Sequence, residues 1–293
     1  MIELNNADLK VQINPDGAEL SSVKEQSENL EYMWQADPKF WGRHAPVLFP
    51  IVGRLKDDHY TVAGQSYKMT QHGFARDQTF KVVSHDATSA IFELVADDAT
   101  KAMYPFDFKL QLRYTLEGHM LTVIYHVENP DAEATLPFSI GGHPAFNVPL
   151  GPNEGGFEDY QITVAPKKTY PQIPLIGPYN DAQHEKELNL TTPLQLDHDL
   201  FNQDALILDL NQVETTVMLS STLNDHGVAL TLAQAPYVGI WSPYPKQAPF
   251  VCIEPWWGIA DNLTADGELT HKQAIQQLAP NTQFEAAYQL RFF

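Results

Sequence analysis

Apolar and polar residues alternate along much of this chain, and this pattern constrains the fold more than any other feature. Every second residue is apolar on both sides of Gly118: Phe108, Leu110, Leu112, Tyr114 and Leu116 before it, and Leu121, Val123, Tyr125 and Val127 after it. Side chains of a strand point to opposite faces in turn, so each run buries one face. The glycine between the runs predicts a β-hairpin.

The same period continues elsewhere, while helical periodicity is weak. Residues 284–292 alternate in the same way, and Gly64 marks a further hairpin in TVAGQSYKM. Residues 98–103 predict one or two helical turns, and residues 271–278 are a second, weak helical candidate. Because 21 prolines also disfavour long helices, the many short strands predict an all-β sandwich or barrel.

The chain is predicted to be a single domain of residues 1–293. All-β sandwiches reach about 250 residues as one domain, and the sequence has neither an internal repeat nor a low-complexity linker. Residues 152–178 are the richest in Gly and Pro, but they include the strand-like stretch YQITV. We therefore interpret them as an excursion within one domain.

The charge balance and the N-terminus restrict the expected partners and location. The chain has 18 basic and 37 acidic residues, a net charge of −19. Phosphate backbones and anionic surfaces attract clustered Lys and Arg, so nucleic acid and membrane are not expected partners. The start MIELNNADLK lacks a leader pattern, and no apolar run approaches the roughly 20 residues of a membrane span. With a single cysteine, Cys252, these features predict a cytoplasmic protein.

Common metal, nucleotide and nucleophile motifs are absent from the sequence. It contains no HxH, HExxH or CxxC spacing, no GxGxxG or P-loop, and no GxSxG. A metal site assembled from distant residues stays open. Cys252 lies in the apolar stretch FVCIE, which is typical of a small buried side chain.

Four stretches place titratable side chains among apolar, Gly and Pro residues. They are PVLFPIVGRL at 46–55, QHGFAR at 71–76, GGHPAFN at 141–147 and CIEPWWGIAD at 252–261. Glycine permits close backbone approach and proline fixes the chain, so each stretch can hold a polar group rigidly. Ordinary loops share this composition, so a structural role for each histidine stays open.

Glu254 is the most unusual of these side chains, because the apolar residues 255–257 follow it directly. Carboxylates are seldom buried unless they are paired, so a structural ion pair with Arg54 or Arg76 is one interpretation. A carboxyl group beside tryptophan in an apolar site has a raised pKa, and a histidine titrates near about 6.5. Glu254 and His143 would then supply a base and an acid near neutral pH.

In this order and spacing, the four stretches resemble those of the aldose 1-epimerases, or galactose mutarotase-like proteins, and most closely a divergent bacterial branch. The likeness extends from VQINPDGAELSSV to the final FEAAYQLRFF. It implies a large antiparallel β-sandwich, the galactose mutarotase-like supersandwich, with a concave sugar-binding cleft. It implies no metal and no organic cofactor, and a small-molecule sugar or sugar phosphate as the partner.

The resemblance also implies roles for individual residues. His143 corresponds to the general acid that acts on the ring oxygen, and Glu254 to the general base that acts on the anomeric hydroxyl. Arg54 and His72 correspond to side chains that hold the sugar. Asp204 in FNQDALIL is our candidate for the aspartate that binds sugar hydroxyls.

The identity of the sugar depends on three further positions. Aromatic faces stack on sugar rings, and Trp256 is our candidate for such a contact. Well-studied galactose mutarotases have Asn before the acid histidine, where this chain has Gly142. In a related branch that resembles hexose-6-phosphate epimerases, an arginine of the HG-x-AR stretch binds phosphate; Arg76 occupies that position and Arg43 is placed to assist. Guanidinium groups suit phosphate because they bind it bidentately.

Other functions stay open at this stage. A non-catalytic sugar-binding or sensing protein would share the fold and the aromatic contacts. A glycoside hydrolase needs two carboxylates about 5–10 Å apart, and only Glu254 has a motif context. A metal-dependent isomerase is a more distant alternative, and no pattern indicates the oligomeric state.

Overall fold

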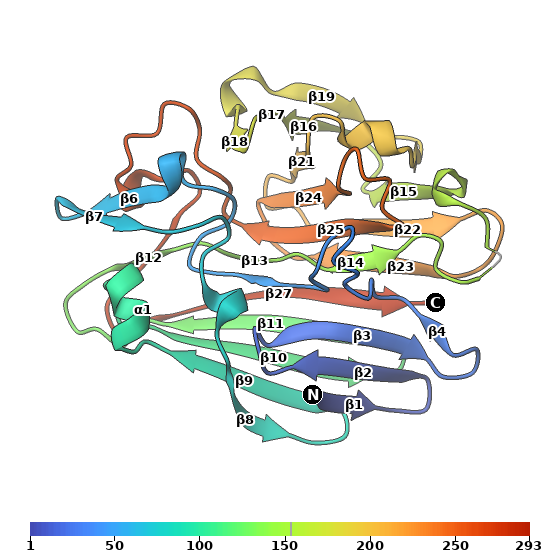
Figure 1. Cartoon of the computed structure of the whole chain (residues 1–293), viewed down its shortest axis with the longest axis horizontal. Helices are drawn as coiled ribbons and strands as arrows, with labels where there is room; N and C mark the ends of the chain where they lie inside the picture. Colours follow the sequence, from blue (N-terminus) through green and yellow to red (C-terminus); the bar gives the residue numbers. More distant parts are fainter. Residues whose placement is uncertain (153) are drawn as a thin grey trace.

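The computed structural model of the chain describes residues 1–152 and 154–293, and Figure 1 shows two large antiparallel sheets. The first has nine strands in the order β20-β15-β22-β23-β27-β11-β10-β9-β8. Its strands are β8 (Lys81–His85), β9 (Ser89–Val95), β10 (Lys109–Glu117), β11 (Met120–Glu128), β15 (Tyr160–Ala165), β20 (Leu194–Gln195), β22 (Thr215–Ser221), β23 (Gly227–Leu232) and β27 (Gln283–Phe292).

The second large sheet has eight strands and carries two of the four motifs in its centre. Its order is β19-β16-β21-β24-β25-β13-β5, and β14 also pairs with β25. Its strands are β5 (Val47–Leu48), β13 (Ile140–Gly142), β14 (Ala145–Asn147), β16 (Thr169–Ile173), β19 (Lys186–Asn189), β21 (Leu206–Asp209), β24 (Tyr237–Trp241) and β25 (Phe250–Trp257). The two sheets pack against each other, as the contact between Tyr125 on β11 and Trp257 on β25 shows: their rings lie 6.1 Å apart.

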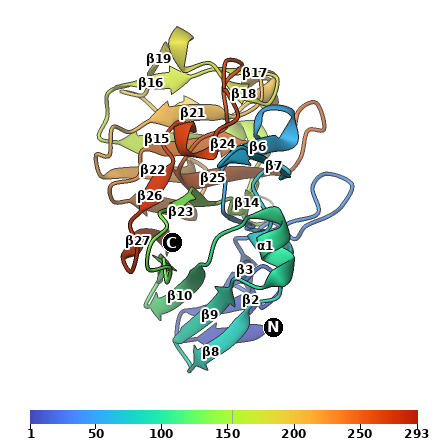
Figure 2. The same ribbon diagram turned by 90° about the vertical axis from the view of Figure 1, so that its left-hand side faces the viewer.

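Smaller sheets and short helices complete the fold. A four-stranded sheet, β1 to β4, lies beside β8 to β10 in Figures 1 and 2, and the Tyr114 hydroxyl donates to the Ala18 carbonyl at 2.7 Å. The remaining strands are β1 (Ile2–Asn5), β2 (Leu9–Asn14), β3 (Glu19–Glu25), β4 (Leu30–Glu31), β6 (His59–Val62), β7 (Gln65–Lys68), β12 (Leu136–Phe138), β17 (Leu175–Ile176), β18 (Tyr179–Asn180) and β26 (Gln276–Leu278). The helices are α1 (Asp98–Met103) and the short 3₁₀ helices η1 (Lys56–Asp58), η2 (Ala75–Asp77), η3 (Phe157–Asp159), η4 (Ala182–His184), η5 (His198–Phe201) and η6 (Leu269–His271).

The predicted antiparallel β-sandwich is confirmed, together with its main hairpins. Strands β10 and β11 pair around Gly118 with Leu116 opposite Leu121, and their alternating apolar faces are buried. Strands β6 and β7 form the hairpin expected at Gly64. The predicted turn at residues 98–103 is α1, whose start is capped because the Thr100 N–H donates to Asp97 at 2.8 Å.

The helix predicted for residues 271–278 is wrong. A single 3₁₀ turn ends at His271, and β26 begins at Gln276 and pairs with β12. Ala274 between them has φ of +57°, a left-handed conformation that no continuous right-handed helix contains. Lys272 turns inward to the Asp261 carboxylate at 3.1 Å, so a tertiary contact sets the path of this segment.

One apolar core joins strands from both ends of the chain, from Leu4 to Phe292. The Gly- and Pro-rich excursion at 152–178 belongs to this body, because β15 pairs with β22 in the nine-stranded sheet; Asn153 lies outside the described residues. From this shared core we infer that residues 1–293 form one domain. Among the described residues, no helix has both the length and the apolar character required to cross a membrane.

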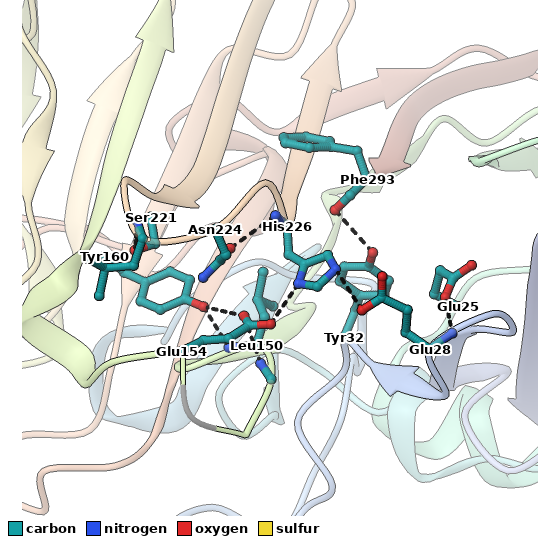
Figure 3. Close-up of polar contacts among 12 residues, drawn as sticks. Glu25, Glu28, Tyr32, Leu150, Glu154, Tyr160, Ser221, Asn224, His226 and Phe293 are labelled. Atoms are coloured by element: carbon teal, nitrogen blue, oxygen red, sulfur yellow. Dashed lines mark hydrogen bonds and ion pairs between the residues drawn. The ribbon is translucent and has the colours of Figure 1, made fainter.

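Polar contacts close one end of the sandwich near the C-terminus (Figure 3). His226 follows β22 and places Nδ1 2.6 Å from Glu154 and Nε2 3.4 Å from Glu28. Tyr160 on β15 donates its hydroxyl to Glu154 at 3.0 Å. These contacts join three turns that are distant in sequence.

Candidate active site

The four motifs meet at a cavity of about 340 Å³ beside β25. Six of the residues named from the sequence or its family resemblance line it: His72, Arg76, His143, Asp204, Glu254 and Trp256. The labels of β13, β14 and β25 lie together near the middle of Figure 1, where the motif strands meet. The cavity has the size expected for a small-molecule site.

His143 and Glu254 face each other in the wall of this cavity. Gly141 pairs with Trp256 and Ala145 with Cys252, so the residues between β13 and β14 form an irregular gap opposite Glu254. His143 lies in that gap, and its Nε2 is 3.1 Å from Glu254 Oε2. The side chains are buried, with residue exposures of 7% and 1%. The alternative pairing of Glu254 with Arg54 or Arg76 is therefore not what the structure shows.

The position before His143 is crowded by a side chain of the nine-stranded sheet. A Cβ atom on Gly142 would lie 2.6 Å from the Tyr125 hydroxyl of β11. A side chain here, including the Asn of well-studied galactose mutarotases, would require the Tyr125 ring to shift. Packing between the two sheets thus favours glycine at position 142.

We expect Gly142→Ala to destabilise the protein by about 1–3 kcal/mol, as overpacking usually does. Removing the hydroxyl in the Gly142→Ala/Tyr125→Phe double variant should recover part of that loss. Urea unfolding of the two single variants and the double variant measures the coupling. Strictly additive losses would show that the hydroxyl is not the obstacle.

Burial shifts both members of the pair away from their ionised forms. It raises the pKa of Glu254 well above the ordinary carboxyl value, with Asp204 adding to the rise and the Trp256 indole opposing it. It lowers the pKa of His143 to about 3, and Arg76 and Arg43 contribute. The raised carboxyl pKa confirms the expectation from sequence, whereas the histidine titrates far below 6.5. Burial thus favours a protonated Glu254 facing a neutral His143, with Oε2 and Nε2 3.1 Å apart.

His72 is fixed on the cavity wall by strained backbone. It has φ of +67°, unusual for a residue with a side chain, and its Nδ1 accepts the Gly53 N–H at 3.1 Å. Burial lowers its pKa, as do His143 and the nearby Arg76 and Arg43. His72 is therefore neutral, with Nε2 as its remaining N–H donor.

Asp204 brings a second carboxyl group to the cavity. Its φ of +73° is again left-handed, and its side chain accepts the N–H of Ala205 at 2.8 Å. Burial raises its pKa, while a contact with Trp241 acts in the opposite direction. Polar residues with strained backbone cluster at functional sites, so this geometry agrees with a ligand-binding role.

The comparisons with known proteins identify the family. The family model for aldose 1-epimerase matches residues 1–276. This chain belongs to the aldose 1-epimerase family. Protein LacX from Lactococcus lactis is 32% identical over 301 residues, covering 99% of this chain and 98% of the relative.

Two solved structures show the same fold over nearly the whole chain. A galactose mutarotase related enzyme from Lactobacillus acidophilus is 41% identical, with a TM-score of 0.97 over 99% of this chain and 96% of its own. A galactose mutarotase-like protein from Lactobacillus casei is 33% identical, with a TM-score of 0.91 over 100% of both chains. The predicted family membership is thus shown.

The three arginines proposed for the site of this epimerase-family chain lie at different distances from the cavity. Arg76 lines the cavity and donates to the Gln71 carbonyl at 2.7 Å. Arg43 lies beside it and pairs with Asp77 at 2.7 Å. Arg54 is not among the described residues that line the cavity; its guanidinium lies 3.3 Å from Asp58.

Two tryptophans and a glutamine were missed by the sequence analysis. Trp41, Trp241 and Gln71 line the cavity of this epimerase-family protein. Gln71 stands next to His72 within a quoted motif, so that motif was a usable signal. Trp41 and Trp241 belong to no motif, and only tertiary packing brings them here.

Cys252 is buried as expected, yet its sulfur lies close to the pair. His143, Cys252 and Glu254 each offer a ligand atom within 4.8 Å of the others, the one group among the described residues that could hold a metal ion. Burial and Glu254 raise the pKa of the thiol, so a metal would have to displace its proton. A chelator therefore belongs in any activity assay of this epimerase-family protein.

Proposed function

We propose that this protein is an aldose 1-epimerase, an isomerase that interconverts the α and β anomers of a hexose or hexose phosphate. The observation that carries the proposal is the buried contact of 3.1 Å between His143 and Glu254 on the cavity wall. Ring opening needs one group that accepts a proton and another that donates one. Two facing titratable side chains that hold one proton between them supply both.

The proton transfers balance within the pair. In its ionised form, Glu254 accepts the proton of the C1 hydroxyl while imidazolium His143 donates to the ring oxygen. The C1–O5 bond breaks, and C1 and O1 become the aldehyde. Opening leaves Glu254 protonated and His143 neutral, the forms that burial favours. Rotation about C1–C2 and the reverse transfers close the ring from the other face.

The remaining cavity residues are proposed to bind the sugar. His72 would donate from Nε2 to a hydroxyl, and Asp204 would accept from hydroxyls. Trp256 would contact an apolar face of the ring, as aromatic side chains do. Arg54 is retained as a weaker candidate, because it contributes to the low pKa of His72 and so lies near that side chain.

The proposal is tested by following anomer exchange with NMR. Wild-type protein should accelerate exchange between α and β signals of an aldose, with or without a chelator. A sugar-binding or sensing protein would bind without acceleration. Because Asp204 supplies a second carboxyl group, release of a new reducing end from a disaccharide must be measured too; it would indicate a hydrolase.

We further propose that Arg76 decides between a neutral and a phosphorylated sugar. Its side chain is only 18% exposed, and its Nε has no hydrogen-bond partner among the described residues. A charge-assisted bond to phosphate contributes about 1.5–3 kcal/mol. We expect Arg76→Ala to lower kcat/KM for a hexose 6-phosphate roughly 10- to 100-fold more than for the parent hexose.

Arg113→Ala serves as the matched control, because Arg113 lies on β10 and faces Glu285 at 3.7 Å. It should reduce neither activity. If Arg76→Ala lowered both activities equally, Arg76 would not discriminate the phosphate, and the neutral hexose would be the better-supported substrate.

A further inference from the structure

The His143 ring lacks the hydrogen bond that usually orients such a group. An acid–base histidine is normally held through its second ring nitrogen by a carboxylate or carbonyl group. Here Nε2 lies 3.1 Å from Glu254, but Nδ1 is buried without a hydrogen-bond partner in the described part of the chain. Packing contacts must therefore keep the ring oriented with Nε2 toward Glu254.

Three aromatic rings surround the imidazole instead. The Trp41 indole stacks on it, with centroids 4.7 Å apart and an interplanar angle of 29°. Trp241 meets it edge-on at 5.5 Å and 85°, and His72 at 5.7 Å and 90°. These are the favoured stacked and T-shaped geometries of aromatic pairs. A ring in this setting cannot rotate without displacing an indole.

The chain that carries Trp41 is itself held firmly. The Trp34 indole donates to the Trp41 carbonyl at 2.9 Å. Glu19 accepts the backbone N–H of His44 at 2.7 Å, and the His44 carbonyl accepts the N–H of Ala145 at 3.0 Å. The segment is thus tied to the residues that follow His143, so that Trp41 and the imidazole are positioned together.

We propose that Trp41 is a positioning residue, whose indole face holds the His143 ring so that Nε2 points to Glu254 and the substrate. This role rests on the proposed epimerase function. It replaces a hydrogen bond with aromatic packing, which constrains the ring while leaving Nδ1 unpaired. Trp41 makes no proton transfer of its own.

The test compares three variants by saturation kinetics of anomer exchange. Trp41→Leu keeps apolar bulk but removes the stacked face. It should lower kcat by about 10- to 100-fold, because small misplacements of a catalytic group have effects of that order. KM should change little, and Trp41→Phe should restore most of kcat. Tyr67→Leu is the matched control, since Tyr67 stacks on Tyr60 at 5.5 Å rather than on His143, and it should keep the wild-type kcat.

A second measurement does not depend on activity. In protein with ¹³C- and ¹⁵N-labelled histidine, the wild-type His143 ring should give one sharp set of NMR signals and stay neutral down to low pH. In Trp41→Leu the signals should broaden, and the pKa should move up toward the ordinary value as solvent reaches the ring. If the wild-type protein did not accelerate anomer exchange, the proposed function would be wrong, but this NMR test of ring order could still be carried out.

Three results would overturn the positioning role. One is a Trp41→Leu variant with unchanged kcat and sharp His143 signals. Another is an equal loss of kcat in Trp41→Leu and Trp41→Phe. The third is a rise in KM with kcat retained, which would show that the indole binds the sugar instead.

Discussion

Glu254→Gln is expected to reduce the rate of anomer exchange by about 10²- to 10⁴-fold, the usual contribution of a general acid or base. Glutamine has the shape of glutamate but cannot accept a proton. His143→Asn should cause a comparable loss, because the two side chains form one unit across 3.1 Å. The double variant should be scarcely slower than either single variant. NMR exchange rates at saturating sugar measure all three.

Loss of activity in Glu254→Gln should not come from loss of the fold. Burial raises the pKa of Glu254 in the folded state above its value in the unfolded state. The contribution of Glu254 to the free energy of unfolding is therefore fully present below the ordinary carboxyl pKa, and it is lost as pH rises through the folded-state pKa. At pH 7–8 the neutral amide should leave the protein as stable as wild type, or more stable. Urea unfolding at pH 5 and pH 8 tests this sign.

The pH profile of wild type follows from the same pair. The pair gains a second proton only near the low pKa of His143, about 3, and loses its single proton only above the raised pKa of Glu254. We expect kcat/KM to be nearly flat from roughly two pH units above the low pKa of His143 up to the raised pKa of Glu254. Exchange that persisted at the wild-type rate in both single variants would refute the assignment of the acid and the base.

Gly73→Ala is expected to cost about 2–5 kcal/mol of stability. Gly73 has φ of +70°, which costs about 1–2 kcal/mol for a residue with a side chain. An added Cβ would also lie 2.3 Å from the Phe49 carbonyl oxygen, and overpacking adds about 1–3 kcal/mol. Because Gly73 follows His72, the same change should displace that imidazole and weaken the sugar binding proposed for it.

Gly64→Ala is the matched control for the backbone term. Gly64 has φ of +78°, but an added Cβ there meets nothing within 4 Å. Its expected loss is only the left-handed term, about 1–2 kcal/mol. Urea unfolding midpoints of the two variants separate the cost of the left-handed backbone from the cost of the contact between the added Cβ and Phe49. Equal losses would mean that the Phe49 contact relaxes without cost.

Much of the fold could be predicted from local patterns. The hairpin around Gly118 and the buried face of β27 follow from alternation, because a strand directs successive side chains to opposite sides whatever lies next to it. The helix expected at 271–278 failed because its weak local signal was overridden by the inward turn of Lys272 toward Asp261. A pattern that depends on neighbouring residues alone cannot include such a contact.

Local residue patterns were enough to predict the alternating strands and the motifs that point to His143 and Glu254. Contacts between distant segments bring these two side chains to 3.1 Å, stack Trp41 on the imidazole and place Arg54 beside Asp58. Burial in the folded chain also lowers the pKa of His143. The reason is physical: side-chain direction along a strand is a local property, whereas burial, desolvation and contact between distant segments arise only when the two sheets close on each other.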